Sequence, residues 1–263
     1  MKLSIMPPRT AGSEAEVVLP GERTNTEGKA VSNRILLALP DDEFHAVRPF
    51  LGFVSFPHHA SLHEPGQRIE FVYFPNSGLI SVVVPTREGK TVEVGVVGTE
   101  GVAGTSAAVG LNYSPHRSVV QIAGDGFRIQ IDRLRSLLQL TPQLQFMIVR
   151  YAVILGIQAA QSAACNRLHG IEQRLARWLL MMQDRIQDSS LRITHDFLAT
   201  MLGTDRPSVS LAAGILQKKG TIEYTRGAVR VLNRKKLEEC ACECYAVIQQ
   251  FNGPLGVNGP VSV

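Results

Sequence analysis

The stretch LGTDRPSVSLAAGILQKKG, residues 202–220, joins a polar beginning to an apolar remainder. Gly203 suits a tight turn that needs a positive φ, because glycine has no Cβ. Pro207 suits the first turn of a helix, where its missing N–H leaves no hydrogen bond unmade. Val209, Ala213 and Leu216 then recur at helical spacing. The stretch therefore predicts a helix whose first turn is exposed and whose later turns pack on a core.

The flanking residues complete a helix–turn–helix–hairpin pattern. Thr194 is a good N-cap for a first helix with Phe197 and Met201 on its apolar face. The segment IEYTRGAVRVL, residues 222–232, predicts a β-hairpin that turns at Arg226. In such a winged module the start of the second helix enters the major groove of DNA, and a basic wing meets phosphates. The residues that point outward from this leading end are Arg206, Ser208, Ser210 and Leu211.

The charge of the chain is concentrated in the same region. Residues 191–236 hold nine Lys and Arg against three acids, a net charge of +6, whereas the whole chain carries +4. The remainder is therefore slightly acidic. A basic segment in an otherwise weakly acidic chain favours a polyanionic partner, and we predict double-stranded DNA.

The N-terminal half has a different character. Short apolar runs such as FVYFPNSG, LISVVVP and VEVGVVG alternate with Pro and Gly turns from residue 34 to residue 131. Many short strands with frequent turns are typical of a sandwich, roll or barrel. We predict a β-roll sensor domain over residues 31–140. Residues 1–30, rich in Pro, Gly, Thr and Glu, are predicted to be a disordered tail.

One long helix is predicted for residues 141–167, where Pro142 suits the first turn. A helix this apolar must bury more than one face. One face can pack on the β domain and another on a second copy of the chain, which predicts a homodimer. A monomer with this helix buried between two domains is the alternative. The apolar stripe comprises Leu144, Ile148, Tyr151, Leu155 and Ser162, and a flanking band comprises Met147, Ile154 and Ile157.

No run of about 18 uninterrupted apolar residues occurs, and Arg150 interrupts the nearest candidate, FMIVRYAVILGIQAA. The N-terminus has no apolar core of signal-peptide length. These features predict a cytoplasmic protein without a membrane segment. We assign residues 168–237 to the DNA-binding domain and residues 238–263 to a C-terminal helix and a loose tail.

Four cysteines are present, three of them in the segment LEECACECYAV. If that segment is one helix, Cys240 and Cys244 share a face while Cys242 points away, which is poor geometry for a tetrahedral metal site. We therefore predict that the thiols are buried or idle and that the protein binds no metal and no other cofactor. A redox or metal role for Cys240, Cys242 and Cys244 stays open. Since no cysteine precedes Cys165, an N-terminal iron–sulfur cluster has no ligands.

Residues 34–237 resemble the Crp–Fnr family of bacterial transcription regulators, most strongly in ITHDFLATMLGTDRPSVSLAAGILQKKGTIEYTRGAVRVLNRKKLE. The resemblance implies an α+β fold. It combines an N-terminal β-roll (a jelly roll of cyclic-nucleotide-binding type), a long dimerisation helix and a C-terminal winged helix-turn-helix. It also implies sequence-specific DNA binding without enzymatic activity, with RNA polymerase and a small-molecule effector as further partners.

The recognition helix departs from the family pattern, in which an Arg-Glu pair is followed by a second Arg one turn on. Arg206 matches the first position, but Pro207 replaces the Glu and Leu211 stands where the second Arg would be. The usual family operator is therefore not expected, because a bidentate Arg–guanine contact is worth about 1–3 kcal/mol of discrimination. We predict a different operator. Its predicted base readers are Arg206, Ser208 and Ser210, and its predicted phosphate contacts are Lys218, Lys219 and Arg226. Thr204, in the turn before the helix, is also predicted to bind DNA.

The family's nucleotide pocket uses a Gly-Glu pair and an Arg followed by a small residue. Arg117 and Ser118 match the second pair, whereas the first is reversed as Glu100-Gly101. By alignment, Ala159 and Ala160 stand where the cyclic-AMP-binding activator presents hydroxyls to adenine. Cyclic AMP binding is therefore not expected and the effector stays open. The predicted pocket residues are Glu100, Gly101, Arg117 and Ser118, with an ion-paired edge-strand role equally open for Arg117.

Two other function classes fit parts of the sequence. FPHHASLHEPG, residues 56–66, suggests a cupin-like metal-dependent enzyme, although the H-x-H spacing of cupins is absent. Haem bound through His58, His59, His63 or His116 also stays open. The other class is a protein-binding adaptor that keeps a vestigial winged helix. Steeply salt-dependent binding to duplex DNA would argue against an adaptor.

Overall fold

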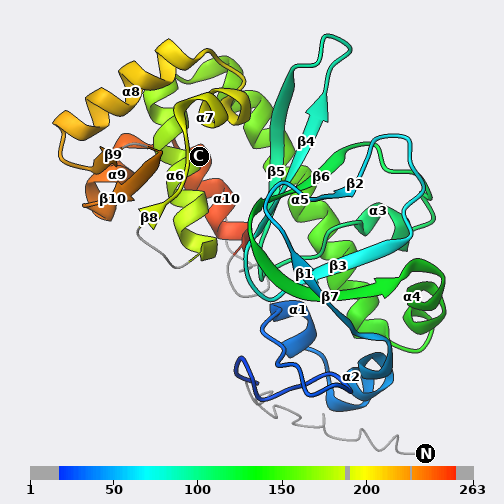
Figure 1. The fold of residues 1–263 in the computed structure, drawn as a ribbon. Helices are drawn as coiled ribbons and strands as arrows, with labels where there is room; N and C mark the ends of the chain where they lie inside the picture. Colours follow the sequence, from blue (N-terminus) through cyan, green and yellow to red (C-terminus); the bar gives the residue numbers. More distant parts are fainter. Residues whose placement is uncertain (1–17, 187–189, 226, 253–263) are drawn as a thin grey trace, which may run out of the picture.

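The computed structural model describes residues 18–186, 190–225 and 227–252. Figure 1 shows an N-terminal β-roll, a long helix that runs beside it, and a second, smaller module of helices with a short sheet. The predicted α+β fold class, with a β-roll, a long helix and a winged helix-turn-helix, is confirmed.

Two sheets make the β-roll. The first has the order β1-β7-β3, and the second has the order β2-β6-β4-β5. Every pairing in them is antiparallel; Phe53 faces Phe127 in the first sheet, and Val82 faces Ser118 in the second. The strands are β1 (Gly52–Phe56), β2 (Ser61–His63), β3 (Phe71–Pro75), β4 (Leu79–Pro85), β5 (Thr91–Val97), β6 (Arg117–Ile122) and β7 (Gly124–Gln130).

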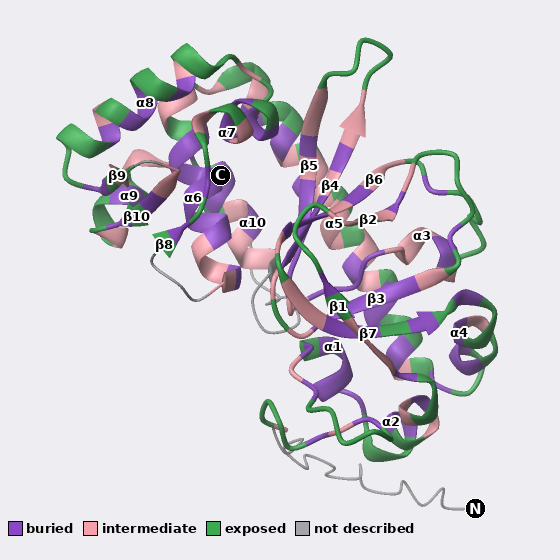
Figure 2. Cartoon of the chain, in the orientation of Figure 1, coloured by how far each residue is buried: buried purple, intermediate pink, exposed green. Residues whose placement is uncertain are grey.

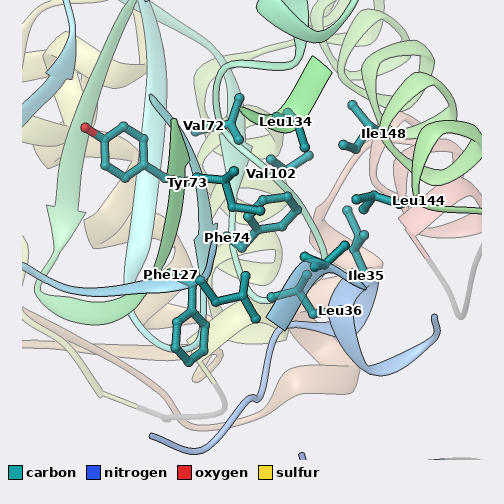
Figure 3. Close-up of a cluster of buried hydrophobic side chains, with 14 of the residues drawn as sticks. Ile35, Leu36, Val72, Tyr73, Phe74, Val102, Phe127, Leu134, Leu144 and Ile148 are labelled. Atoms are coloured by element: carbon teal, nitrogen blue, oxygen red, sulfur yellow. The ribbon is translucent and has the colours of Figure 1, made fainter. Parts of the chain in front are cut away.

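Short helices close the roll, and their apolar residues fill its interior. Asn33 fixes the start of α1, because its side-chain oxygen accepts from the backbone N–H groups of Ile35 and Leu36. Figure 3 shows Ile35, Leu36 and Phe74 in one apolar cluster. The helices are α1 (Arg34–Leu37), α2 (Asp41–Val47), the 3-10 turn η1 (Arg48–Phe50), α3 (Thr105–Ala108) and α4 (Ile131–Leu138).

Helix α5 (Pro142–Leu168) is 27 residues long and packs one face on the roll. The Glu43 carboxylate accepts the free N–H groups of Gln143 and Leu144 in its first turn, both at 2.9 Å. By length and composition alone α5 could cross a membrane, but this is weak evidence, because the core helices of soluble proteins pass the same test. Its buried residues are Leu144, Met147, Ile148, Tyr151, Gln158, Ser162 and Cys165.

The second module has the predicted order of elements. Thr194 caps its first helix by accepting from the N–H of Phe197 at 3.2 Å, and Gly203 turns the chain with φ +60°. The short sheet has the order β8-β10-β9. The elements are α6 (Ile171–Ile186), β8 (Ser190–Leu191), α7 (His195–Leu202), α8 (Arg206–Lys218), β9 (Ile222–Thr225), β10 (Ala228–Val231), α9 (Arg234–Cys240) and α10 (Cys244–Asn252).

A second buried apolar cluster, distinct from the one inside the roll, joins the two modules. Leu79 and Val96 of the roll lie in the same buried cluster as Leu175 and Trp178 of α6. A buried hydrogen bond crosses this boundary, from Trp178 Nε1 to Glu93 Oε1 at 2.8 Å. The purple residues along α6, β4 and β5 in Figure 2 mark this contact. The winged module is therefore packed against the roll and is not a free appendage.

Two expectations about the ends of the chain need correction. Residues 18–30 lie in the described part and are ordered, because the Arg23 guanidinium is buried and donates to the carbonyl oxygens of Leu36 and Leu39. Residues 1–17 and 253–263 of the predicted tails lie outside the described residues. The cysteine-rich segment is not one helix, because residues 241–243 separate α9 from α10.

Candidate nucleic-acid interface and effector cavity

Helix α8 presents its first turn to solvent and buries its later turns. Asp205 is the N-cap; its carboxylate accepts from the N–H of Ser208 at 2.8 Å and from its hydroxyl at 3.1 Å. Arg206 and Ser210 are exposed, and Leu211 is 67% exposed. The buried residues of α8 are Val209, Ala212, Ala213 and Leu216. The side of α8 away from the module's core is therefore open to a partner, as Figure 2 shows.

A histidine outside the predicted set of DNA contacts lies beside this surface. His195 Nδ1 lies 2.8 Å from Ser210 Oγ, and its ring stacks on Tyr224 at 4.0 Å between centroids. Burial and the nearby charge of Arg206 lower the pKa of His195, so its ring is neutral at pH 7. The contact orients the Ser210 hydroxyl. The sequence signal was weak, because a histidine after an N-cap has no distinctive pattern.

The predicted charged contacts lie in different surroundings. Arg206 Nε is 3.7 Å from Asp196 Oδ1, and both side chains are at least 65% exposed, so the pair is weak. Lys218 is exposed at the end of α8. Lys219 pairs with Glu172 of α6. Ser208 and Thr204 are half-buried beside the turn, and the predicted contact Arg226 lies outside the described residues.

A cavity of about 330 Å³ lies between the four-stranded sheet, α3 and α5. Among its described lining residues there is no Lys, Arg, Asp or Glu. Burial lowers the pKa of His63 and of His116, the two titratable residues of the lining, so both are neutral at pH 7. The wall from α5 consists of Ala152, Leu155, Gly156 and Ala159. The cavity therefore suits a neutral, largely apolar molecule.

Most of the predicted pocket residues lie elsewhere. Ser118 lines the cavity, but Arg117 donates from Nε to Glu64 Oε2 at 2.8 Å on the outer side of the sheet. Glu100 pairs with Arg185 of α6 at 2.8 Å. Gly101 packs against Tyr151, whose ring leaves no room for a Cβ. Three of the four residues are thus used in structural contacts.

The histidine-rich segment does not assemble a metal site in the described residues. His58 and His59 stack on one another at 3.7 Å between ring centroids and lie on the surface. His63 Nε2 is 2.9 Å from the carbonyl oxygen of Phe71 and is buried. Within the described part of the chain, none of these rings belongs to a group of three or more ligand side chains. The cupin-like reading therefore has no support from the geometry.

These features define a class of protein. A winged helix-turn-helix with an exposed basic leading end reads DNA, and here it is packed on a β-roll that has a cavity beside α5. Residues 173–240 match the family model for the Crp-like helix-turn-helix domain. A search of curated proteins finds no match.

Solved structures share this fold over most of the chain. The c-di-GMP responsive global regulator CLP of Xanthomonas campestris is 15% identical over 73% of this chain and 99% of its own, with a TM-score of 0.62. FixK2 of Bradyrhizobium japonicum is 14% identical over 73% and 98%, with a TM-score of 0.62. A Crp/Fnr regulator of Eubacterium rectale is 15% identical over 77% and 94%, with a TM-score of 0.61. The chain therefore carries a Crp-like helix-turn-helix domain and shares the fold of these Crp/Fnr regulators.

Proposed function

We propose that the chain is a homodimeric regulator that reads an inverted repeat in DNA and responds to a neutral effector in the β-roll cavity. The observation that carries the proposal is the exposed leading end of α8 on a basic module. Catalysis is not part of the proposal. A cytoplasmic location and contact with RNA polymerase stay predictions.

The dimer is supported by an uncovered apolar seam on α5. Phe146, Val149 and Val153 are 56%, 42% and 60% exposed. With the exposed residues Gly156 and Ala160 they are spaced by three and four positions in alternation. This is the heptad spacing of two helices that pack side by side. The seam is a different set of residues from the predicted stripe, which packs largely on the roll.

A dimer through α5 would carry two copies of α8. In dimeric helix-turn-helix proteins the two recognition helices enter successive major grooves, about 34 Å apart. Arg206 suits guanine, and the exposed Leu211 suits the methyl group of thymine. We therefore expect half-sites that contain both kinds of base pair, read together with Ser208 and Ser210.

The DNA proposal is tested by selecting bound sequences from random duplexes with the wild type, Arg206→Ala and Lys218→Ala. Arg206→Ala is expected to relax the preference at one position of each half-site, at a cost of about 1–3 kcal/mol. Lys218→Ala is expected to weaken all sequences alike and to reduce the salt slope. Arg133→Ala on α4, an exposed arginine outside the winged module, removes the same charge as a control. An unchanged preference in Arg206→Ala would refute the reader assignment.

The dimer is tested by sedimentation of Val153→Glu. A charge in the seam is expected to give monomers, since burying an unpaired carboxylate is costly. Gln145→Glu places a charge on an exposed position of α5 outside the seam and is expected to leave the dimer intact. A dimeric Val153→Glu, or a monomeric wild type, would contradict this seam.

The effector proposal is tested by calorimetry with cyclic AMP and cyclic di-GMP. Neither is expected to bind, because the described lining of the cavity has no cation for a phosphate. Neutral apolar probes of matching volume are expected to raise the unfolding temperature, and Gly95→Leu should remove this effect by filling the cavity. Tight binding of either nucleotide that Ser118→Leu abolishes would overturn the proposal.

A further inference from the structure

Four potential metal ligands meet at the junction of α5 and α6, and none of them lines the cavity or belongs to α8. Cys165 lies in the last turn of α5, and His169 follows directly after that helix. Cys242 lies in the break between α9 and α10, and Cys244 is the first residue of α10. One ligand atom from each residue lies within 4.8 Å of the other three. Segments more than 70 residues apart in sequence are thus brought to one point.

The distances suit a single tetrahedral ion. Cys165 Sγ is 3.4 Å from Cys242 Sγ, and Cys244 Sγ is 3.6 Å from His169 Nδ1. With Zn–S bonds near 2.3 Å and Zn–N bonds near 2.0 Å, a tetrahedron has edges of roughly 3.8 Å between two sulfurs and roughly 3.5 Å between sulfur and nitrogen. An iron–sulfur cluster needs its ligands further apart, because each binds a different iron.

The histidine is held in the tautomer that a metal requires. Its Nε2 lies 3.1 Å from Oε1 of Glu243, the residue between Cys242 and Cys244 in the sequence. When Nε2–H donates to this carboxylate, the lone pair of Nδ1 is free and faces Cys244. A carboxylate that orients a ligating histidine in this way is the usual outer partner of a zinc site.

Burial and charge complete the site. Cys165, Cys242 and Cys244 are each at most 4% exposed, so all four positions of an ion would be taken by protein. Three thiolates and one neutral imidazole around Zn²⁺ leave a net charge of −1. Arg174 and Arg177 lie on the adjoining turns of α6, and each has a buried Nε without a hydrogen-bond partner. Their charges compensate the site.

We propose that Cys165, His169, Cys242 and Cys244 form a closed Cys₃His site for one Zn²⁺. Binding releases the protons of the thiols to solvent. The ion joins the C-terminal end of α5 to the start of α10. It does so next to the two-residue link between α5 and α6. It therefore fixes the direction in which the winged module leaves α5. The site depends on neither the DNA reading nor the effector proposed above.

The test uses the purified full-length chain under reducing conditions. After removal of metal by a chelator, we expect one Zn²⁺ per chain to rebind by elemental analysis. Co²⁺ as a probe should show the thiolate charge-transfer and visible bands of a tetrahedral site. Cys242→Ser should lose both signals. Cys240→Ser is the matched control, since Cys240 lies outside the group, and it should keep both.

Two further variants keep the test decisive if Cys242→Ser fails to fold. His169→Cys should retain one ion with a cobalt spectrum shifted toward four thiolates. Glu243→Gln should fold and bind zinc about 10–100-fold more weakly. Absence of zinc and cobalt binding by the folded, reduced wild type would overturn the proposal. A Cys165–Cys242 disulfide would also overturn it, if this bond forms in protein purified without reductant and persists after zinc and reductant are added.

Discussion

The buried Glu93 at the boundary of the two modules makes folding depend on pH. Burial raises the pKa of this carboxyl from 4.5 to about 7, against the opposing effect of its hydrogen bonds with Ser81 and Trp178. Because the folded pKa is raised, the folded state favours the protonated form. The stabilisation is complete below pH 4.5 and is lost as the pH rises through 7.

Glu93→Gln removes this titration and keeps the shape of the side chain. A carboxyl with pKa 4.5 unfolded and about 7 folded loses about 2.5 kcal/mol of folding free energy between pH 5 and pH 8. We therefore expect the stability of the variant, relative to the wild type, to rise by this amount over that range. Any further difference in unfolding free energy that the amide itself causes is the same at every pH and does not affect this trend.

The measurement is urea unfolding at several pH values and fixed protein concentration, followed by the fluorescence of Trp178. It is the chain's one tryptophan and contacts Glu93 directly. Glu88→Gln, whose side chain is 78% exposed between β4 and β5, is the control and should show no comparable trend. If the difference between wild type and Glu93→Gln stayed flat from pH 5 to pH 8, the carboxyl would not be buried as described.

Two further substitutions, Gly101→Ala and Arg185→Met, test the contact of the roll with α5 and its contact with α6. Gly101→Ala places a Cβ 2.0 Å from Tyr151 Cζ and should cost about 3 kcal/mol in urea unfolding, whereas Gly214→Ala, in open space on α8, should add up to about 1 kcal/mol. An equal effect of both would contradict the close contact at Gly101. Arg185→Met leaves Glu100 without its partner in a buried setting and should lower stability by about 3–5 kcal/mol at neutral pH. A loss below about 1 kcal/mol by thermal unfolding would show that the pair is solvated.

The sequence predicted the winged module well because local chemistry determines it. Thr194, Gly203 and Pro207 each have a backbone role that depends on near neighbours, and the apolar spacing of α8 selects its buried face. The β-roll was equally predictable from its turn residues. The resemblance to the Crp–Fnr family rests on the same local patterns.

The cavity and the cysteine group were not predictable in the same way, because both depend on contacts between distant segments. Glu100 has the residue type of a pocket carboxylate, yet its partner is Arg185, 85 positions later. The cysteine spacing argued against a metal only while the segment was assumed to be one helix. The non-helical residues 241–243 bring Cys242 to Cys165, a pairing that no local pattern contains.

The exposed seam of α5 also changes in bulk along its length. Phe146, Val149 and Val153 occupy its first half, and Gly156 and Ala160 begin its second. The distance between packed helices follows the size of the side chains between them, within about 8–10 Å. In the proposed dimer the two helices would converge toward their C-terminal ends, where the winged modules are attached. The apolar side chains of the seam would thereby set the distance between the two recognition helices on the duplex.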